Sequence, residues 1–174
     1  MKLAILGFGR EGKSLLKFLQ RRGLMWTGTR TDADENEIWI LDKNEKVKIP
    51  KGVKKQTGKN YLKNLERFDI VFRSPGVPYL SKEIQKAKIA GTKISSPTKL
   101  FFEEIGKMVR RGSPQVIGIT GTKGKGTTST LLYQILKSAG KKVFLAGNIG
   151  TPALDILSKT QMLADKNADK RGYK

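Results

Sequence analysis

The stretch that decides the fold is Lys2-Leu-Ala-Ile-Leu-Gly-Phe-Gly-Arg-Glu-Gly12, together with the residues that follow it. Its first five residues are mostly apolar, which predicts a buried strand over residues 2–6. Residues 14–22 repeat with a helical period and place apolar side chains on one face, namely Leu15, Leu16, Phe18 and Leu19. A strand, a glycine turn and a helix in this order are typical of the start of a parallel sheet covered by helices.

The same alternation continues along the first part of the chain. Short apolar runs predict strands over residues 38–41, 69–73 and 93–95, and helices are expected over residues 61–67, 81–90 and 97–105. The polar residues 27–37 are expected to form a surface excursion. We therefore predict a Rossmann-like α/β domain over residues 1–107, and a linker over residues 108–114, where Gly112 and Pro114 disfavour a helix.

A second glycine-rich stretch is Gly118-Ile-Thr-Gly-Thr-Lys-Gly-Lys-Gly-Thr-Thr128. It lies between an apolar run at residues 115–120, which predicts a strand, and a helix expected to start near Thr127. Gly121, Gly124 and Gly126 fall in the connecting turn, where backbone N–H groups, the helix start and Lys125 attract phosphate. The alternative is a turn that only joins a strand to a helix, but the agreement of all these features favours phosphate binding.

This stretch differs from the usual phosphate loop, G-x-x-x-x-G-K-[ST], at two positions. Ile119 stands where the first glycine is expected, and Gly126 stands where the hydroxyl residue is expected. A magnesium ion would then be held by Thr127 or Thr128. We predict a truncated P-loop α/β domain over residues 115–174, which ends in a polar tail from residue 158.

Candidate ligand contacts follow the predicted strands, at the edge where parallel sheets bind ligands. Gly7, Gly9 and Gly12 permit a tight turn and a close approach of phosphate. Asp42 either holds a ribose or caps its own turn, and Ser74 is either a contact or part of a plain Ser-Pro-Gly turn. Asn148, after a predicted strand at residues 142–146, either lies beside the phosphate loop or only forms a turn.

Composition narrows the function further. The 174 residues carry 35 Lys and Arg against 15 Asp and Glu, a formal net charge of +20, but the lysines are scattered and few aromatics lie among them. We therefore expect no specific nucleic-acid partner. Cysteine and histidine are absent, which makes a zinc or thiol site improbable and favours an oxygen-bound ion such as Mg²⁺. No stretch has the apolar length of a membrane span, so we expect a cytoplasmic protein without membrane insertion.

These features, in this order, resemble the Mur ligase family of peptidoglycan synthesis, and most closely its D-glutamate-adding members. The resemblance covers residues 1 to about 157. It rests on five stretches: Gly7-Phe-Gly-Arg-Glu-Gly12, Leu41-Asp-Lys-Asn-Glu45, Ser74-Pro-Gly-Val77, Ile119-Thr-Gly-Thr-Lys-Gly-Lys125 and Gly147-Asn-Ile-Gly-Thr-Pro-Ala-Leu154.

The resemblance implies a three-domain enzyme that is monomeric at full length. Its first domain would hold the UDP of UDP-N-acetylmuramoyl-L-alanine, its central domain ATP and Mg²⁺, and its third domain D-glutamate. The implied reaction is ATP-driven amide formation through an acyl phosphate. By likeness, the UDP-substrate contacts are Gly7, Gly9, Arg10, Glu11, Gly12, Asp42, Lys43, Ser74 and Asn148.

For ATP, the contacts that the resemblance implies are Gly121, Thr122, Lys123, Gly124, Lys125, Gly126, Thr127 and Thr128. Lys125 is the expected catalytic residue and Thr127 the expected magnesium ligand. The chain departs from the family at two of these positions, since the family usually has asparagine at position 123 and serine or threonine at position 126.

The largest departure is length, because family chains continue with a magnesium-binding glutamate, a histidine, a carbamylated lysine and the whole amino-acid-binding domain. We therefore expect an incomplete fragment, inactive alone, with exposed apolar surface over residues 131–136 or 143–146. Two other functions stay open. One is a stand-alone module that binds a UDP-sugar or a dinucleotide, and the other is an NAD-dependent dehydrogenase, which leaves Lys125 unexplained.

Overall fold

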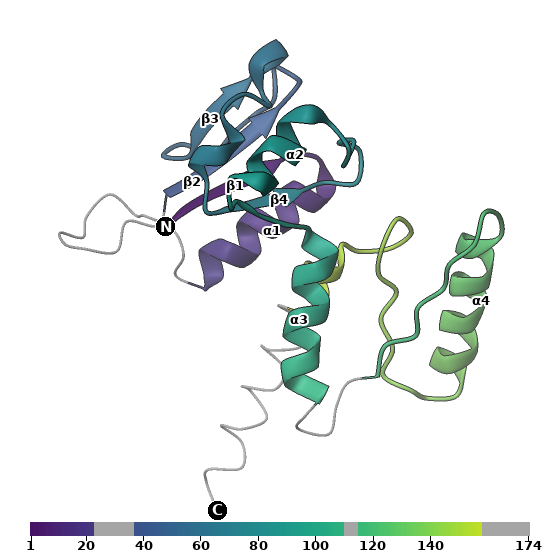
Figure 1. Ribbon diagram of the computed structural model, residues 1–174. Coiled ribbons are helices and arrows are strands. Elements are labelled where there is room, and N and C mark those ends of the chain that lie inside the picture. The colour runs from purple at the N-terminus through teal and green to yellow at the C-terminus, as the bar shows by residue number, and fades with distance from the viewer. Residues whose placement is uncertain (23–36, 110–114, 158–174) are drawn as a thin grey trace, which may run out of the picture. The chain divides into compact units, whose positions relative to one another are not determined.

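The computed structural model describes residues 1–22, 37–109 and 115–157 (Figure 1). The contacts between residues divide the chain into two compact units, Met1–Leu100 and Phe101–Lys174. We call them unit 1 and unit 2.

The described part of unit 1 contains a five-stranded sheet in which every pairing is parallel. Its strands are β1 (Lys2–Leu6), β2 (Glu37–Asp42), β3 (Lys54–Thr57), β4 (Ile70–Arg73) and β5 (Lys93–Ser95), in the spatial order β3-β2-β1-β4-β5. Helix α1 (Arg10–Arg21) follows β1, and helix α2 (Lys82–Ile89) lies between β4 and β5. This is the strand order of a Rossmann-like domain, as the sequence predicts.

The two faces of the sheet bury different side chains, because successive residues of a strand point to opposite faces. Ala4 and Leu6 of β1 belong to a core cluster that also includes Leu41, Leu65, Phe68, Val71, Val77, Ile84 and Ala87. The opposite face carries Ile5, whose side chain lies against the start of α1 at Gly12. The predicted apolar stripe of α1 is confirmed, since all four of its members are buried. Both faces are therefore covered, as a parallel sheet requires.

Strand β3 is the strand that the sequence analysis missed. Its residues, Lys-Lys-Gln-Thr, lack an apolar alternation, and Lys54 and Lys55 are exposed. It lies at the edge of the sheet, where lysines protect the unpaired side of a strand. The Gln56 side chain donates hydrogen bonds to the backbone oxygens of residues 60, 61 and 63, so this strand also organises the loop that follows it.

One predicted helix of unit 1 is wrong. Residues 61–67 form no α-helix, and the structure instead has two 3₁₀ turns, η1 (Gly58–Asn60) and η2 (Leu65–Arg67). Asn64 interrupts the segment because it adopts a left-handed conformation, with φ of 56°. Leu65 and Phe68 are still buried in the core cluster, so the apolar pattern reflects burial of these side chains without a helix.

Unit 2 contains most of helix α3 (Pro97–Val109) and helix α4 (Lys125–Ser138). The two strands predicted here are wrong, because residues 115–120 and 142–146 form no strand and only an isolated bridge joins Ala146 to Thr151. A strand needs a neighbour for its backbone hydrogen bonds, and the described part of unit 2 supplies no second strand. The truncated P-loop domain therefore remains a prediction, although its helix starts within two residues of the expected position.

The expected exposed apolar surface is present in unit 2. No residue of α4 is buried, and Leu131 and Ile135 are 60% and 56% exposed. Val116, Ile117 and Phe144 are exposed as well. The burial that unit 2 does have includes Leu154 and Leu157, each 1% exposed. The helix α4 thus has an apolar face without a core beneath it.

Several predicted segments lie wholly or mostly outside the described residues. These are the surface excursion at residues 27–37, apart from its last residue, the polar tail from residue 158, and residues 110–114 of the predicted linker. The linker and the two domain ranges stay predictions. The contacts divide the chain between Leu100 and Phe101, inside α3, which is seven residues before the expected end of the first domain.

Candidate functional site

Three loops of unit 1 meet at the carboxyl edge of its sheet. The turn after β1 begins at Gly7, β2 ends at Asp42, and β4 is followed by Ser74. Strand β1 pairs with β2 on one side and with β4 on the other, and the chain crosses over from β3 to β4, so the strand order reverses beside β1. Such a point in a parallel sheet forms a crevice at the strand ends, and this is where open α/β sheets bind ligands.

The glycine turn is built so that only glycine fits at two of its positions. Gly7 has a φ of +91°, and a Cβ there would stand 2.9 Å from the Cβ of Ser74. A Cβ on Gly12 would overlap the Gly7 carbonyl oxygen, so this glycine lets α1 pack against the turn. By contrast, no atom beyond the two chain neighbours of Gly9 lies within 4 Å of its Cβ position. The turn is therefore closed on the protein side and open at Gly9.

Ser74 joins the end of β4 to this turn. Its hydroxyl donates a hydrogen bond to the Gly7 carbonyl oxygen at 2.8 Å, and its backbone N–H donates to the Leu6 carbonyl oxygen at 2.9 Å. The sequence left open whether Ser74 contacts a ligand or is only part of a Ser-Pro-Gly turn. Its side chain does more than form a turn, because it holds the neighbouring glycine turn in place. Whether it also contacts a ligand remains a prediction.

Asp42 holds the same turn from the other side. One carboxylate oxygen accepts the Phe8 backbone N–H at 2.7 Å, and the other accepts the Asn44 N–H at 2.8 Å. The second bond is the turn cap that the sequence analysis considered. The first bond connects β2 to the glycine turn across 34 residues of sequence. A ribose contact stays a prediction. The carboxylate lone pairs that Phe8 and Asn44 do not use would accept hydrogen bonds from the ribose hydroxyl groups.

The remaining predicted contacts of unit 1 surround the same edge. Arg10 and Glu11 are the first two residues of α1, whose N-terminus follows the open Gly9, and Lys43 is exposed directly after β2. The first N–H groups of a helix have no partner within the helix, and they carry its positive end. The structure thus brings Gly7, Gly9, Arg10, Glu11, Gly12, Asp42, Lys43 and Ser74 to one edge of one sheet.

The other predicted residues belong to unit 2, where the glycine loop leads into α4. Gly124, at a φ of +76°, directly precedes the helix, and Lys125 is its first residue. The Lys125 ammonium group donates to the backbone oxygens of Gly121 and Thr122, so the lysine lies across the loop. Lys123, Thr127 and Thr128 are exposed around this helix start. A helix N-terminus beside an ammonium group fits a polyphosphate.

Asn148 also lies in unit 2, in the turn between the two bridged residues Ala146 and Thr151. It is exposed, and the turn is closed by a hydrogen bond from the Gly147 N–H to the Thr151 carbonyl oxygen at 3.1 Å. Ile149 of this turn packs on the first turn of α4, because a Cβ on Gly126 would overlap its side chain. Position 126, which has no hydroxyl group, is therefore a place where Ile149 packs against the backbone of α4.

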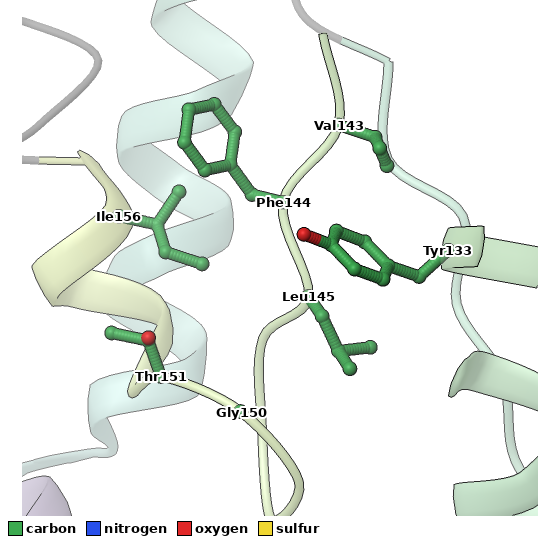
Figure 2. A pocket seen from close by; sticks show the side chains of 7 residues that line it. All are labelled: Tyr133, Val143, Phe144, Leu145, Gly150, Thr151 and Ile156. Atoms are coloured by element: carbon green, nitrogen blue, oxygen red, sulfur yellow. The ribbon is translucent and has the colours of Figure 1, made fainter. Parts of the chain in front are cut away.

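A shallow cavity of about 300 Å³ lies in unit 2 between α4 and the segment that follows it (Figure 2). Figure 2 shows Tyr133 reaching from α4 toward Leu145. The lining is mostly apolar and consists of Tyr133, Val143, Phe144, Leu145, Gly150, Thr151 and Ile156. None of these residues is a predicted phosphate contact. The cavity corresponds to incomplete packing beneath α4.

Two further observations concern a metal site and a membrane span. Among residues 1–22, 37–109 and 115–157, no cluster of acidic, histidine or cysteine side chains has the geometry of a metal site. In the same ranges, no helix has the length and apolar character needed to cross a membrane.

Sequence reasoning missed the side chain of Arg73, the last residue of β4. The sequence predicts this residue only as the end of a strand, although its guanidinium group donates to three backbone oxygens of the turn that contains Ser74. A basic residue directly before a Ser-Pro-Gly turn is the signal that was available.

Comparison with known proteins agrees with the fold of unit 1. The family model of the Mur ligase MurD-like N-terminal domain matches residues 1–96, which is the sheet domain just described. The chain is 37% identical to a UDP-N-acetylmuramoylalanine–D-glutamate ligase of Acetivibrio thermocellus, over 94% of this chain and 32% of that protein. It is 38% identical to the ligase of the same name from Clostridium tetani, over 87% of this chain and 31% of that protein.

A third relative, the ligase of that name from Clostridium acetobutylicum, is 32% identical over 95% of this chain and 33% of its own length. The chain therefore spans about a third of the length of the curated relatives it matches. Because the family model covers more than half of the 174 residues, we conclude that the chain belongs to the Mur ligases and carries an N-terminal domain of the MurD-like family.

Proposed function

We propose that unit 1 binds the UDP part of UDP-N-acetylmuramoyl-L-alanine, as one portion of an ATP-dependent ligase that adds D-glutamate to this nucleotide in the cytoplasm. The observation that carries the proposal is the turn at Gly7, which Ser74 and Asp42 hold from two sides. A fixed turn with an open glycine and a helix N-terminus favours a diphosphate. The names of the relatives support the choice of nucleotide.

The glycine loop of unit 2 supports the ATP part of the proposal. Backbone N–H groups at the start of α4 and the Lys125 ammonium group would bind the ATP phosphates, with Gly121, Gly124 and Gly126 permitting the close approach. Magnesium, when bound, would neutralise charge on these phosphates, and the Thr127 or Thr128 hydroxyl would be its ligand from this loop. The exposed position of both threonines is compatible with that role.

The proposed reaction places two anions side by side. An oxygen of the alanyl carboxylate attacks the γ-phosphorus of ATP, the bond from that phosphorus to the bridging oxygen breaks, and ADP leaves. The D-glutamate amine then attacks the acyl carbon, loses a proton and displaces phosphate. Lys125 would stabilise charge on the transferred phosphoryl oxygens, which is the main contribution of a protein to this chemistry.

We propose further that the 174 residues bind ligands without turning them over. The apolar residues Leu131 and Ile135 of α4 are more than half exposed, and the segment before the glycine loop forms no strand. A phosphate loop relies on a rigid strand and a covered helix to fix its geometry. ATP binding at this loop is therefore expected to be weak.

A second candidate function is a binding module for a dinucleotide, which the strand order and the glycine turn equally favour. Calorimetric titration of the full chain with UDP and with ADP separates the two functions at unit 1. The ligase proposal predicts that UDP binds and that ADP binds only through Lys125, so that Lys125→Ala abolishes the ADP signal and leaves the UDP signal. Lys137→Ala, in the last turn of the same helix, is the control for removing a lysine from α4.

The opposite result would be equal binding of UDP and ADP that Lys125→Ala does not change. Both nucleotides would then share a site in unit 1, and the dinucleotide module would replace the ligase as the function of this domain.

A further inference from the structure

The Arg73 side chain forms several hydrogen bonds to the turn that follows β4. Its Nη1 atom donates hydrogen bonds to the carbonyl oxygens of Ser74 at 3.2 Å and Pro75 at 3.5 Å, and also to that of Val77. The residue is partly buried, and its guanidinium carbon lies 5.5 Å from the centre of the Tyr79 ring. A single charged nitrogen therefore binds three oxygens of one short turn.

Other contacts also hold this turn, and they limit the part of its backbone that Arg73 can position. The Val77 N–H donates to the Ser74 carbonyl oxygen at 3.1 Å, and the Val77 side chain is buried in the core cluster. Tyr79 is held in place by Gln85, whose amide donates to the Tyr79 carbonyl oxygen at 2.7 Å. The far end of the turn is thus anchored, and Arg73 controls the path of the backbone between Ser74 and Val77.

Ser74 transmits this control to the glycine turn. Its hydroxyl donates to the Gly7 carbonyl oxygen, and its Cβ lies so close to Gly7 that no side chain fits there. Because protein interiors are closely packed, a shift of Ser74 must move the backbone at Gly7. The influence of Arg73 on the glycine turn passes through Ser74, which contacts both.

We propose that Arg73 is a positioning residue for the nucleotide site of unit 1. It holds the Ser74–Val77 turn, the turn places the Ser74 hydroxyl, and the hydroxyl sets the backbone that faces the diphosphate. The inference rests on the proposed function for its ligand, but the mechanical connection from Arg73 to Gly7 belongs to the fold and is testable without any ligand.

The first test uses UDP as the probe and the full chain. Arg73→Ala is expected to bind UDP about tenfold more weakly, which corresponds to the loss of a hydrogen bond from a charged donor. Arg73→Lys is expected to stay within about threefold of the wild type, since an ammonium group offers three N–H donors that can reach the same oxygens. Such a rescue is not expected if the arginine only packs on Tyr79.

The matched control is Arg67→Ala, on the other side of β4. Arg67 also stacks on aromatic rings, with its guanidinium carbon 4.2 Å from the Trp39 ring centre, and it donates to Gln56 at 2.8 Å. We expect it to lower stability to denaturant about as much as Arg73→Ala while leaving UDP affinity within twofold. Equal losses of UDP affinity in the two folded variants would overturn the proposal.

The second test is independent of the ligand and uses amide hydrogen exchange. Arg73→Ala is expected to accelerate exchange at Ser74 and Gly7, whose N–H groups donate to Leu6 and Leu41. The Lys93 amide, which donates to Asp69 before the start of β4, is the internal reference. If exchange at Gly7 and Ser74 does not change relative to Lys93, the inference is wrong. If the wild type binds no UDP but these amides respond, the proposed function fails and the positioning role of Arg73 stands.

Discussion

The Ser74 hydroxyl donates a hydrogen bond of 2.8 Å to the carbonyl oxygen of Gly7, and its Cβ lies 2.9 Å from the place where a Cβ on Gly7 would stand. The two residues are separated by 67 positions in the sequence and belong to neighbouring strand ends. This pair joins two of the three loops that form the carboxyl edge.

Gly7→Ala is expected to lower the free energy of unfolding by about 2–4 kcal/mol, because it combines a left-handed backbone conformation with overlap against Ser74. Ser74→Gly removes the overlap, so the double variant should lose less stability than the sum of the single variants. Urea denaturation measures all three. Gly9→Ala, with free space and a φ of −77°, is the control and should cost at most about 1 kcal/mol, the cost of alanine at a helix N-cap. Additive losses in the double variant would contradict the contact.

Asp42→Asn is expected to destabilise the chain by about 1–3 kcal/mol and also to weaken UDP binding. An amide accepts through one oxygen only, so it cannot satisfy both the Phe8 and the Asn44 N–H groups. Denaturation and calorimetry provide the two measurements.

The control for this change is Asp69→Asn. Asp69 accepts the Lys2 backbone N–H at 2.6 Å, before the start of β4 and away from the carboxyl edge. It should lose stability but keep UDP affinity. The proposed role of Asp42 is wrong if its variant binds UDP as the wild type does.

The stability of unit 1 is expected to depend on pH through Glu37. The hydrogen bond from Lys54 holds the pKa of Glu37 below its usual value. A lowered pKa in the folded state gives stability that is present above the ordinary glutamate pKa of about 4.3 and is lost as pH falls through the folded value. The Lys54 end of the pair is exposed to solvent, which screens the interaction, so we expect a loss below about 1 kcal/mol.

Urea denaturation of the wild type and of Glu37→Gln, measured between neutral pH and pH 3, tests this dependence. The difference in stability between them should shrink at the acid end, because both side chains are then uncharged. A difference that stays constant across the range would show that Glu37 contributes no proton-linked stability. The Glu66 pKa, which the hydrogen bond from Lys86 lowers, contributes in the same direction to both proteins.

Unit 2 is expected to be cleaved by a protease before unit 1 and to associate with itself. Its exposed Leu131 and Ile135 present an apolar face on α4. Replacing both by glutamine should reduce self-association in sedimentation velocity, with a change of stability within about 0.5 kcal/mol per site. Ile89→Gln, at an exposed isoleucine of α2 in unit 1, is the control and should leave association unchanged. Equal protease resistance of the two units would contradict this prediction.

The sheet of unit 1 was largely predictable from the sequence, because its apolar strands are buried on both faces. The strands at residues 2–6 and 93–95 were predicted with the bounds that the structure has, and β2 and β4 were found within a residue at each end. Edge strand β3 was missed because its polar residues carry no such pattern. In unit 2, apolar runs at residues 115–120 and 142–146 predicted strands that do not form, since an apolar pattern cannot supply the neighbouring strand that pairs with it.

The candidate site was predicted in part for the same reason. Residue types after the strands indicated which positions lie at the carboxyl edge, and Gly7, Asp42 and Ser74 do lie there. What the sequence could not indicate is how they contact one another. The bonds from Ser74 to Gly7 and from Phe8 to Asp42 connect distant residues, and only the three-dimensional arrangement brings them together.

The proposed function of unit 1 depends on recognition of a UDP-linked muramoyl substrate at the carboxyl edge of its sheet. The most direct measurement is calorimetric titration of the full chain with UDP-N-acetylmuramoyl-L-alanine and, separately, with NADH. We expect saturable binding of the muramoyl nucleotide with one site per chain, weakened by Asp42→Asn, and no comparable heat from NADH. Tight binding of NADH without any response to the muramoyl nucleotide would contradict it.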